Sequence, residues 1–357
     1  MKNRAEHVLG SEKIFVGLED SKKTWSLCVR SKGMIVHETS MPAQYEVLRN
    51  YFHNKFPECQ VQVIYEAGFR GFDLHDQLEA DGWECVVTPP HTVTEEKCQR
   101  KKNDRTDCRR LAKNLENGDY HNCFVPDKLL REDRQVSRTC GQVQADITRV
   151  CNRIRRMLEF HGLDNGLSPG RWSGVAYAQL RQHLSNIELS DSLRFSFEIM
   201  FRELDQLRQL KKELLLQLRK LARSDRYKGS VGLLMSAPGI GILTAIRLAL
   251  EWGDVNRFKR KEEFAGFLGL VPSDYSSGDQ EHRGHITKQG NRSVRRWLVE
   301  TAWVAIRHDP ALLEKFRRVL RNCGSKKKAI VAVARKLALR LRKVLLSREP
   351  YAIGVLV

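Results

Sequence analysis

The chain has 357 residues and carries 62 Lys and Arg against 43 Asp and Glu, which gives a net charge of +19. This length fits two or three domains, and an apolar content of 41% is enough to build buried cores. No apolar run approaches the ~18 residues that a membrane span needs, and the first residues lack the apolar stretch of a secretory signal. The nine cysteines are scattered without a C-x-x-C pair, which argues against a disulfide scaffold or zinc ribbon and favours the reducing cytoplasm.

The positive charge is concentrated in the last third of the chain. Residues 226–357 hold 26 Lys and Arg and 11 Asp and Glu, a net charge of +15, whereas the preceding 225 residues carry only +4. Binding of clustered cations to phosphates is favourable because it releases counterions, so nucleic acid is the expected partner. A basic tail without a partner, or a surface that meets anionic lipid, is the alternative.

The first 125 or so residues alternate short apolar runs with segments of helical spacing. A hairpin meander comes first, and strands separated by helices follow it, which predicts a mixed α/β domain whose later strands run parallel. The predicted strands span residues 14–19, 25–29, 34–38, 61–65 and 84–87, and the predicted helices span 43–56 and 74–80.

The middle of the chain, about 130–225, is predicted to be helical, with a loop or hinge at 166–170. Between Ser192 and Arg223, apolar residues recur at intervals of four and three, and Lys211 takes one position of this seam. Such a seam serves either a coiled-coil contact with another chain or an ordinary amphipathic helix packed on its own domain. The apolar seam residues are Met200, Leu204, Leu207, Leu214, Leu218 and Leu221.

The last third is predicted to be mostly helical, broken by one polar loop at about 272–291. Pro238, Gly239 and Gly241 lie in a Pro-Gly-Ile-Gly turn between two helical stretches, which is typical of a helix-hairpin-helix motif. Glycines let the backbone approach a phosphate, and the helix that follows offers free N–H groups to it. A turn that only joins two helices is the alternative.

Four acidic residues in the first part of the chain are candidate metal ligands. Glu19 and Glu66 close the first and fourth predicted strands, and Asp104 and Asp107 are three residues apart on one face of a predicted helix. Ligands bind at strand ends of open α/β sheets, and gathered carboxylates suit Mg²⁺ or Mn²⁺. Two such ions can clamp a phosphodiester for in-line attack. The alternative is that these acids are ordinary solvated side chains.

A serine-bearing loop in the last third is a second candidate site. Ser276 and Ser277 precede Gly278, and a hydroxyl at such a loop tip among cations can attack a phosphate. Ser-Ser-Gly is equally the composition of an ordinary flexible loop. The basic residues that follow, and that are candidates for binding nucleic acid, are Arg283, Lys288, Arg292, Arg295 and Arg296.

These segments together resemble the DEDD transposases of bacterial insertion sequences, a family of bridge-RNA-guided recombinases related to the pilin-gene invertases. The resemblance covers nearly the whole chain, and its motifs occur in a fixed order, which makes the match more specific than any single motif. The motifs are Val16–Lys23, Tyr65–Gly68, Lys102–Asp107, Pro238–Gly241, Phe264–Pro272, Tyr275–Gly278 and Ile286–Asn291.

The resemblance implies a RuvC-like domain of RNase H fold over 11–130, a helical or coiled-coil linker over 131–225, and a basic, mostly helical transposase domain over 226–357. It implies that Ser277, with Ser276 as the fallback, links covalently to DNA in a site shared between subunits of a homo-oligomer, from dimer to tetramer. It further implies a guide RNA that pairs with donor and target DNA near the nucleoid. The metal-binding acids that it implies are Glu19, Glu66, Asp104 and Asp107.

The first of these acids departs from the family pattern, in which Asp is usual at that position. Here the position is Glu19, and Asp20 follows it. Strand alternation places Phe15, Gly17 and Glu19 on one face, which favours Glu19 as the ligand. Asp20 is the alternative.

Two other functions fit the same residues. One is a RuvC-like, metal-dependent nuclease that acts on branched DNA without a covalent serine step. The other is a non-catalytic nucleic-acid-binding protein in which the basic third binds and the acids are vestigial.

Overall fold

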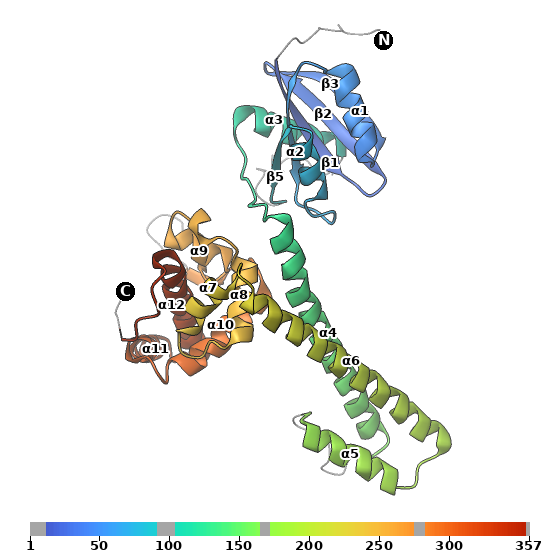
Figure 1. Cartoon of the computed structure of the whole chain (residues 1–357), viewed down its shortest axis with the longest axis vertical. Helices are drawn as coiled ribbons and strands as arrows, with labels where there is room; N and C mark the ends of the chain where they lie inside the picture. Colours follow the sequence, from blue (N-terminus) through green and yellow to red (C-terminus); the bar gives the residue numbers. More distant parts are fainter. Residues whose placement is uncertain (1–11, 91–103, 165–171, 275–282, 355–357) are drawn as a thin grey trace. The chain divides into compact units, whose positions relative to one another are not determined.

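The structure, a computed structural model, describes residues 12–90, 104–164, 172–274 and 283–354 (Figure 1). The chain divides into two compact units, Met1–Pro126 and Asp127–Val357, and each is described by itself. Among the described residues, no helix is both long and apolar enough to cross a membrane. The cysteines in the described ranges are all free thiols.

The N-terminal unit is built on a five-stranded sheet with the strand order β3-β2-β1-β4-β5. Strand β1 pairs antiparallel with β2 and parallel with β4, and β4 pairs parallel with β5. The five predicted strands are confirmed, and so are the three predicted helices, including the one that begins near Asp104. The elements are β1 Lys13–Asp20, β2 Thr24–Ser31, β3 Met34–Pro42, α1 Tyr45–Lys55, β4 Gln60–Glu66, α2 Asp73–Ala80, β5 Glu84–Thr88 and α3 Asp104–Asn117.

The two faces of this sheet are covered by different helices. Because side chains alternate along a strand, Val16 and Leu18 of β1 face the main core, in which Leu48 of α1 and Leu78 of α2 are buried. The opposite face packs against α3, where Ile64 of β4 lies with Leu111 and Leu115. In β1 and β4, the residues between those that face the main core therefore point toward α3.

The C-terminal unit is almost entirely helical. Two 33-residue helices, α4 and α6, lie antiparallel, as the ion pair between Arg153 and Glu203 and the hydrogen bond between Lys211 and Gln144 require. The elements are α4 Lys128–Phe160, α5 Gly174–Asn186, α6 Asp191–Arg223, α7 Lys228–Met235, α8 Ile242–Trp252, the 3₁₀ turn η1 Val255–Arg257, α9 Lys261–Phe267, β6 Pro272–Asp274, β7 Arg283–Ile286, α10 Arg292–Ala305, α11 Pro310–Cys323 and α12 Lys326–Ser347.

Two separate apolar cores hold this unit together. The larger core joins α7 to α12 and includes Cys140 of α4 and Leu218 of α6. The smaller core lies where α5 packs on the other ends of the two long helices, and it includes Val150 and Leu204. The predicted seam of α6 packs on its own unit, with Leu204 and Leu218 buried and the other seam residues partly buried, as in an ordinary amphipathic helix.

The polar segment at 272–291 differs from the prediction, which placed no strand there. Strands β6 and β7 form a short antiparallel hairpin at its base. The hydroxyl of Ser273 donates to the carbonyl oxygen of His285 at 2.9 Å, and the amide of Thr287 donates to the carbonyl oxygen of Val271 at 2.9 Å. These strands are three and four residues long and lack apolar alternation, so the sequence pattern gave no signal for them. The predicted hinge at 166–170 lies outside the described residues.

Candidate functional site

Glu19 and Glu66 lie at neighbouring strand ends on the same face of the sheet. Leu18 of β1 and Tyr65 of β4 are register partners in the parallel pair, and each glutamate is the next residue along its strand. Glu66 stands two residues after Ile64, which packs on α3. By the same alternation, both carboxylates belong to the face covered by α3.

Helix α3 brings Asp107 close to this edge because it packs against the backbone of β1. A Cβ at Gly17 would lie 2.1 Å from the carbonyl oxygen of Cys108 and 2.5 Å from the amide nitrogen of Ala112. Only glycine allows that approach, and Asp107 immediately precedes the contact. The side chain of Asp107 is largely buried, whereas Asp104, one turn earlier, is exposed.

Arg110 places a positive charge between two of the predicted ligands. Its Nη2 lies 3.3 Å from Oε1 of Glu66 and 3.4 Å from Oδ1 of Asp107. The structure therefore brings Glu66 and Asp107 to one cation. Arg110 follows Asp107 by three residues, which is the spacing of a helical ion pair, so this contact could be inferred from the sequence.

The candidate ligands fit a hard divalent cation, because carboxylate oxygens are the ligands that Mg²⁺ and Mn²⁺ prefer. Two of the carboxylates, Glu66 and Asp107, already lie beside a positive charge, the guanidinium of Arg110. A complete four-carboxylate cluster is not formed. Within the described ranges, no three acidic, histidine or cysteine side chains gather closely enough to hold a metal ion.

Asp20 has a structural role on the other face of β1. Its Oδ1 accepts a hydrogen bond from Nε1 of Trp25 at 2.7 Å and lies 3.1 Å from Nε of Arg70, whose guanidinium covers the indole ring. Its side chain is 4% exposed. Burial raises the pKa of Asp20 by more than the hydrogen bond from Trp25 and the charge of Arg70 lower it.

Ser276 and Ser277 lie outside the described residues, but the base of their loop is described. Gly269 and Gly290 pack backbone to backbone, since a Cβ at Gly269 would lie 1.8 Å from the carbonyl oxygen of Gln289 and one at Gly290 would lie 2.1 Å from that of Phe267. Both have positive φ angles, +63° and +85°. Two segments that flank the serine loop are therefore joined closely at its base.

Arg295 differs from the other predicted nucleic-acid-binding cations. Its Nη1 donates to the carbonyl oxygens of Leu268, Gln289 and Gly290, at 3.3, 2.9 and 3.0 Å. Burial, followed by the charge of Arg292, lowers its pKa. The guanidinium of Arg295 therefore holds the base of the serine loop.

The remaining predicted cations occupy the hairpin and the start of α10. Lys288, Arg292 and Arg296 have exposed side chains, and Arg296 lies 4.0 Å from Glu300 on the same helix. Arg283 begins β7. The exposed cations are placed so that an anion from solvent can reach them.

The Pro238–Gly241 turn joins α7 to α8 as predicted, and its glycines have different surroundings. Gly239 has a φ of +85°, and a Cβ there would lie 2.8 Å from the Cβ of Val304 on α10, so packing accounts for this glycine. Gly241 is the N-cap of α8 and has open space around its α-carbon. A phosphate could approach the turn at Gly241, beside the first N–H groups of α8.

The chain matches two family models. The model for DEDD transposases of the IS110 type matches residues 16–162, and the model for the transposase IS116/IS110/IS902 family matches residues 231–317. The first range contains all four predicted metal-binding acids, and the second contains Ser277 and the Pro238–Gly241 turn.

Individual relatives agree with the family models. The chain is 29% identical to the putative transposase y4rJ of Sinorhizobium fredii, over 92% of this chain and 91% of that protein. It is 25% identical to the transposase for insertion sequence element IS1111A of Coxiella burnetii, over 75% of this chain and 73% of that protein. The alignment with a second putative transposase of S. fredii, y4qE, is 28% identical and spans 68% of this chain and 58% of that relative. With both models matched in order along the sequence, the chain belongs to the DEDD transposase family of IS110-type insertion sequences.

Proposed function

We propose that this protein is the recombinase of an insertion sequence, which cuts and rejoins DNA at donor and target sites under the direction of a guide RNA. The observation that carries the proposal is that Glu66 and Asp107 share one cation, the guanidinium of Arg110, while Glu19 ends the neighbouring strand on the same face of the sheet. The strand order β3-β2-β1-β4-β5 supports an RNase H-like, RuvC-like assignment for residues 11–130.

In this proposal Glu19, Glu66, Asp104 and Asp107 hold Mg²⁺ or Mn²⁺ in the active enzyme. The bound ions supply Lewis acidity at the phosphate and at the attacking oxygen. Arg110 must then leave the position between Glu66 and Asp107, and it remains near enough to neutralise a DNA phosphate. Asp104 is exposed on the first turn of α3, so it would turn inward only when a cation binds.

The proposed covalent step belongs to Ser277, with Ser276 as the alternative. The serine oxygen forms a bond to phosphorus while the bond from phosphorus to one deoxyribose oxygen breaks, and the proton lost by serine ends on that leaving hydroxyl. Attack by a second strand's hydroxyl reverses the exchange. Bonds of equal kind are made and broken, so the step needs no external energy source. Arg295 would position the loop, and Arg292 and Arg296 would bind phosphate.

The proposed organisation follows the family. Residues 131–225 would form a helical linker and 226–357 the basic transposase domain, and the acids and the serine of different subunits would complete one site in a homo-oligomer, from dimer to tetramer. The +15 charge of residues 226–357 supports binding of two polyanions, guide RNA and DNA.

The test is a strand-cleavage assay with Mg²⁺, matched donor and target DNA, and the RNA that co-purifies with the protein. Wild-type protein should form a covalent protein–DNA adduct, and Ser277→Ala should lose the adduct and the joined product. Glu66→Gln should lose cleavage altogether. Cleavage that survives Ser277→Ala without an adduct would support the RuvC-like nuclease, and unchanged DNA with wild-type protein would support the non-catalytic alternative.

A further inference from the structure

The pair of long helices in the C-terminal unit is polar and hollow at one point between its two apolar cores. Cys140 and Leu218 belong to the larger core, and Val150 and Leu204 belong to the smaller one. Between them, Lys211 occupies the seam position where apolar spacing would place a leucine. A lysine at such a position costs stability relative to an apolar residue, so it calls for an explanation.

Lys211 lines a pocket of about 460 Å³ between α4 and α6. Two more cations, Arg155 and Arg208, line the same pocket, and no acidic side chain is among the described residues that do so. Polar groups without charge complete the wall, among them Gln144 and Asn152. Three cations without an acid in one hollow make it a site for an anion.

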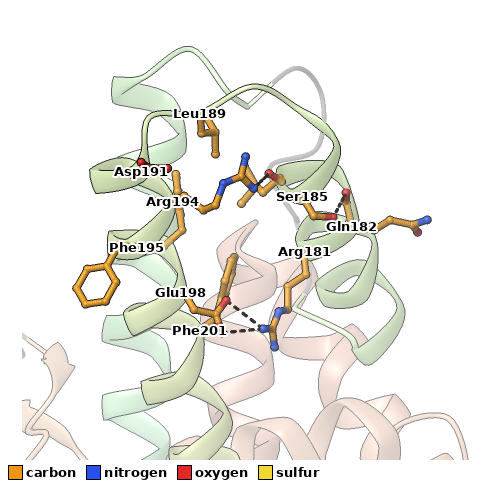
Figure 2. Close-up of a pocket in the computed structure, with 11 residues that line it drawn as sticks. Arg181, Gln182, Ser185, Leu189, Asp191, Arg194, Phe195, Glu198 and Phe201 are labelled. Carbon is orange, nitrogen blue, oxygen red and sulfur yellow. Dashed lines mark hydrogen bonds and ion pairs between the residues drawn. The ribbon is translucent and has the colours of Figure 1, made fainter.

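Another hollow on these helices is lined by acidic as well as basic side chains. This larger hollow, about 670 Å³, lies between α5 and α6, and Figure 2 shows its Arg181 directed at Glu198. Nη2 of Arg181 is 3.2 Å from that carboxylate, and Arg194 donates to the carbonyl oxygens of Leu184 and Ile187. Carboxylates, those of Asp191 and Glu198, therefore line that hollow beside its cations, whereas none is among the described residues that line the 460 Å³ pocket.

Two features make the 460 Å³ pocket suited to more than an isolated anion. The guanidinium of Arg208 stacks on the ring of Tyr177 at 4.2 Å and donates to the carbonyl oxygen of Trp172 at 3.3 Å, so its position is set by the protein. Trp172 also lines the pocket, and its Nε1 is buried without a hydrogen-bond partner among the described residues. A hydrogen bond from such a buried N–H to an acceptor on a ligand would stabilise the complex.

We propose that this pocket binds one unpaired nucleotide of a single-stranded nucleic acid, with its phosphate at Lys211, Arg208 and Arg155 and its base or sugar at Trp172. The size fits, since pockets of about 300–1,000 Å³ hold small ligands and a duplex is too wide to enter. The identification of the anion as a nucleotide rests on the proposed function, whereas the inference that the pocket binds an anion is independent of it. Lys211 donates to Gln144 in the structure, and a phosphate would take over that donor.

The experiment measures binding of the full chain to fluorescent single strands of about 12 nucleotides, RNA in one arm and DNA in another, with a duplex as comparison. Lys211→Gln should weaken single-strand binding about five- to tenfold and reduce the salt slope by about 0.7. Lys212→Gln is the matched control, because Lys212 is an exposed neighbour on the same helix and outside the pocket. Trp172→Phe should weaken binding without changing the salt slope.

Lys211→Leu separates binding from a purely structural role. It restores the apolar seam, so the melting temperature should stay or rise while single-strand affinity falls. Equal losses in Lys211→Gln and Lys212→Gln, or a Lys211→Leu variant that binds normally, would overturn the proposal, as would loss of duplex binding alone. The binding assay involves no cleavage, so its outcome does not depend on whether the catalytic proposal holds, and failure of either proposal is recognised separately.

Discussion

Gly17 and Cys108 meet backbone to backbone, with room for no Cβ between the strand and the helix. The contact sets how near α3 lies to β1, and therefore how near Asp107 can come to the strand ends that carry Glu19 and Glu66. A residue without a functional group thus controls the spacing of the candidate ligands.

Gly17→Ala should push α3 away from β1 and lower both stability and cleavage. The added methyl meets backbone atoms, which cannot rotate aside, so we expect a loss of about 1–3 kcal/mol in the free energy of unfolding. Chemical denaturation measures it. Gly141→Ala is the matched control: Gly141 lies inside α4 with open space around it, and alanine there should stabilise the helix by about 0.5–1 kcal/mol. Equal stability of wild type and Gly17→Ala would contradict the close contact.

Arg110→Met should increase the response of the protein to metal. Without the guanidinium, Glu66 and Asp107 repel each other in the metal-free protein, and a divalent cation gains more by binding there. Thermal melting with and without Mn²⁺ measures this, because a ligand that binds only the folded state stabilises it by mass action. Arg109→Met is the control, since Arg109 pairs with Glu38. If Mn²⁺ raises the melting temperature of both variants and of the wild type by the same amount, no metal binds beside Arg110.

Substitutions at Glu19 and Asp20 should affect different properties, cleavage in the first case and stability in the second. Glu19→Gln removes the charge of a candidate ligand on the α3 face and should abolish metal-dependent cleavage. Asp20→Asn weakens the contacts to Trp25 and Arg70 and should lower the melting temperature while cleavage persists at low temperature. Loss of cleavage in the Asp20 variant alone, with normal melting, would reverse the assignment of the first acid.

Local patterns predicted the N-terminal unit well because each of its strands has its own apolar signal. The run around Val16 and the run around Val63 are strongly apolar, and the acids at their ends could be placed from alternation alone. The close contact of Gly17 with Cys108 depends on residues 91 positions apart in sequence, so no local pattern could reveal it.

The C-terminal unit was predicted less completely. The helices followed from periodicity, but the β6–β7 hairpin depends on tertiary hydrogen bonds such as that from Ser273 to His285. Arg295 and Arg296 are chemically identical neighbours, and only the fold distinguishes the one that holds three carbonyl groups from the one that is exposed.

Arg295→Gln and Arg296→Gln should therefore affect different properties of the protein. The first removes a group that holds the base of the serine loop, so the melting temperature and the covalent step should both fall. The second removes an exposed cation, so DNA affinity should fall with a salt slope smaller by about 0.9, while melting is unchanged. Melting curves and salt-dependent DNA binding separate the two. A normal melting temperature in Arg295→Gln would argue against its structural role.

Asp309 is the buried acid that ties the end of the chain to its core. Its Oδ2 accepts from Arg340 and from the hydroxyl of Tyr351, each at 2.7 Å, and its Oδ1 accepts from the amides of Ala311 and Gly354. Burial raises the pKa of Asp309, but the hydrogen bond from Tyr351 and the charge of Arg340 outweigh it and hold the pKa below its usual value. The stability that this ionised carboxylate contributes is therefore present above the ordinary carboxyl pKa of about 4 and is lost as the pH falls through the lower folded-state value.

Asp309→Asn should destabilise the protein at pH 7 by about 3–5 kcal/mol, because it leaves Arg340 buried without a counter-charge. The difference between wild type and variant should shrink as the pH falls below about 4, because the carboxyl takes up a proton in the unfolded state there and becomes neutral in the folded state only at lower pH. Denaturant titrations at neutral and acidic pH measure both quantities. The double variant Asp309→Asn with Arg340→Met removes the unpaired charge and should recover part of the loss, whereas a double variant less stable than Asp309→Asn would mean that Arg340 acts through its bond to the carbonyl oxygen of Ala352 rather than through the charge of Asp309.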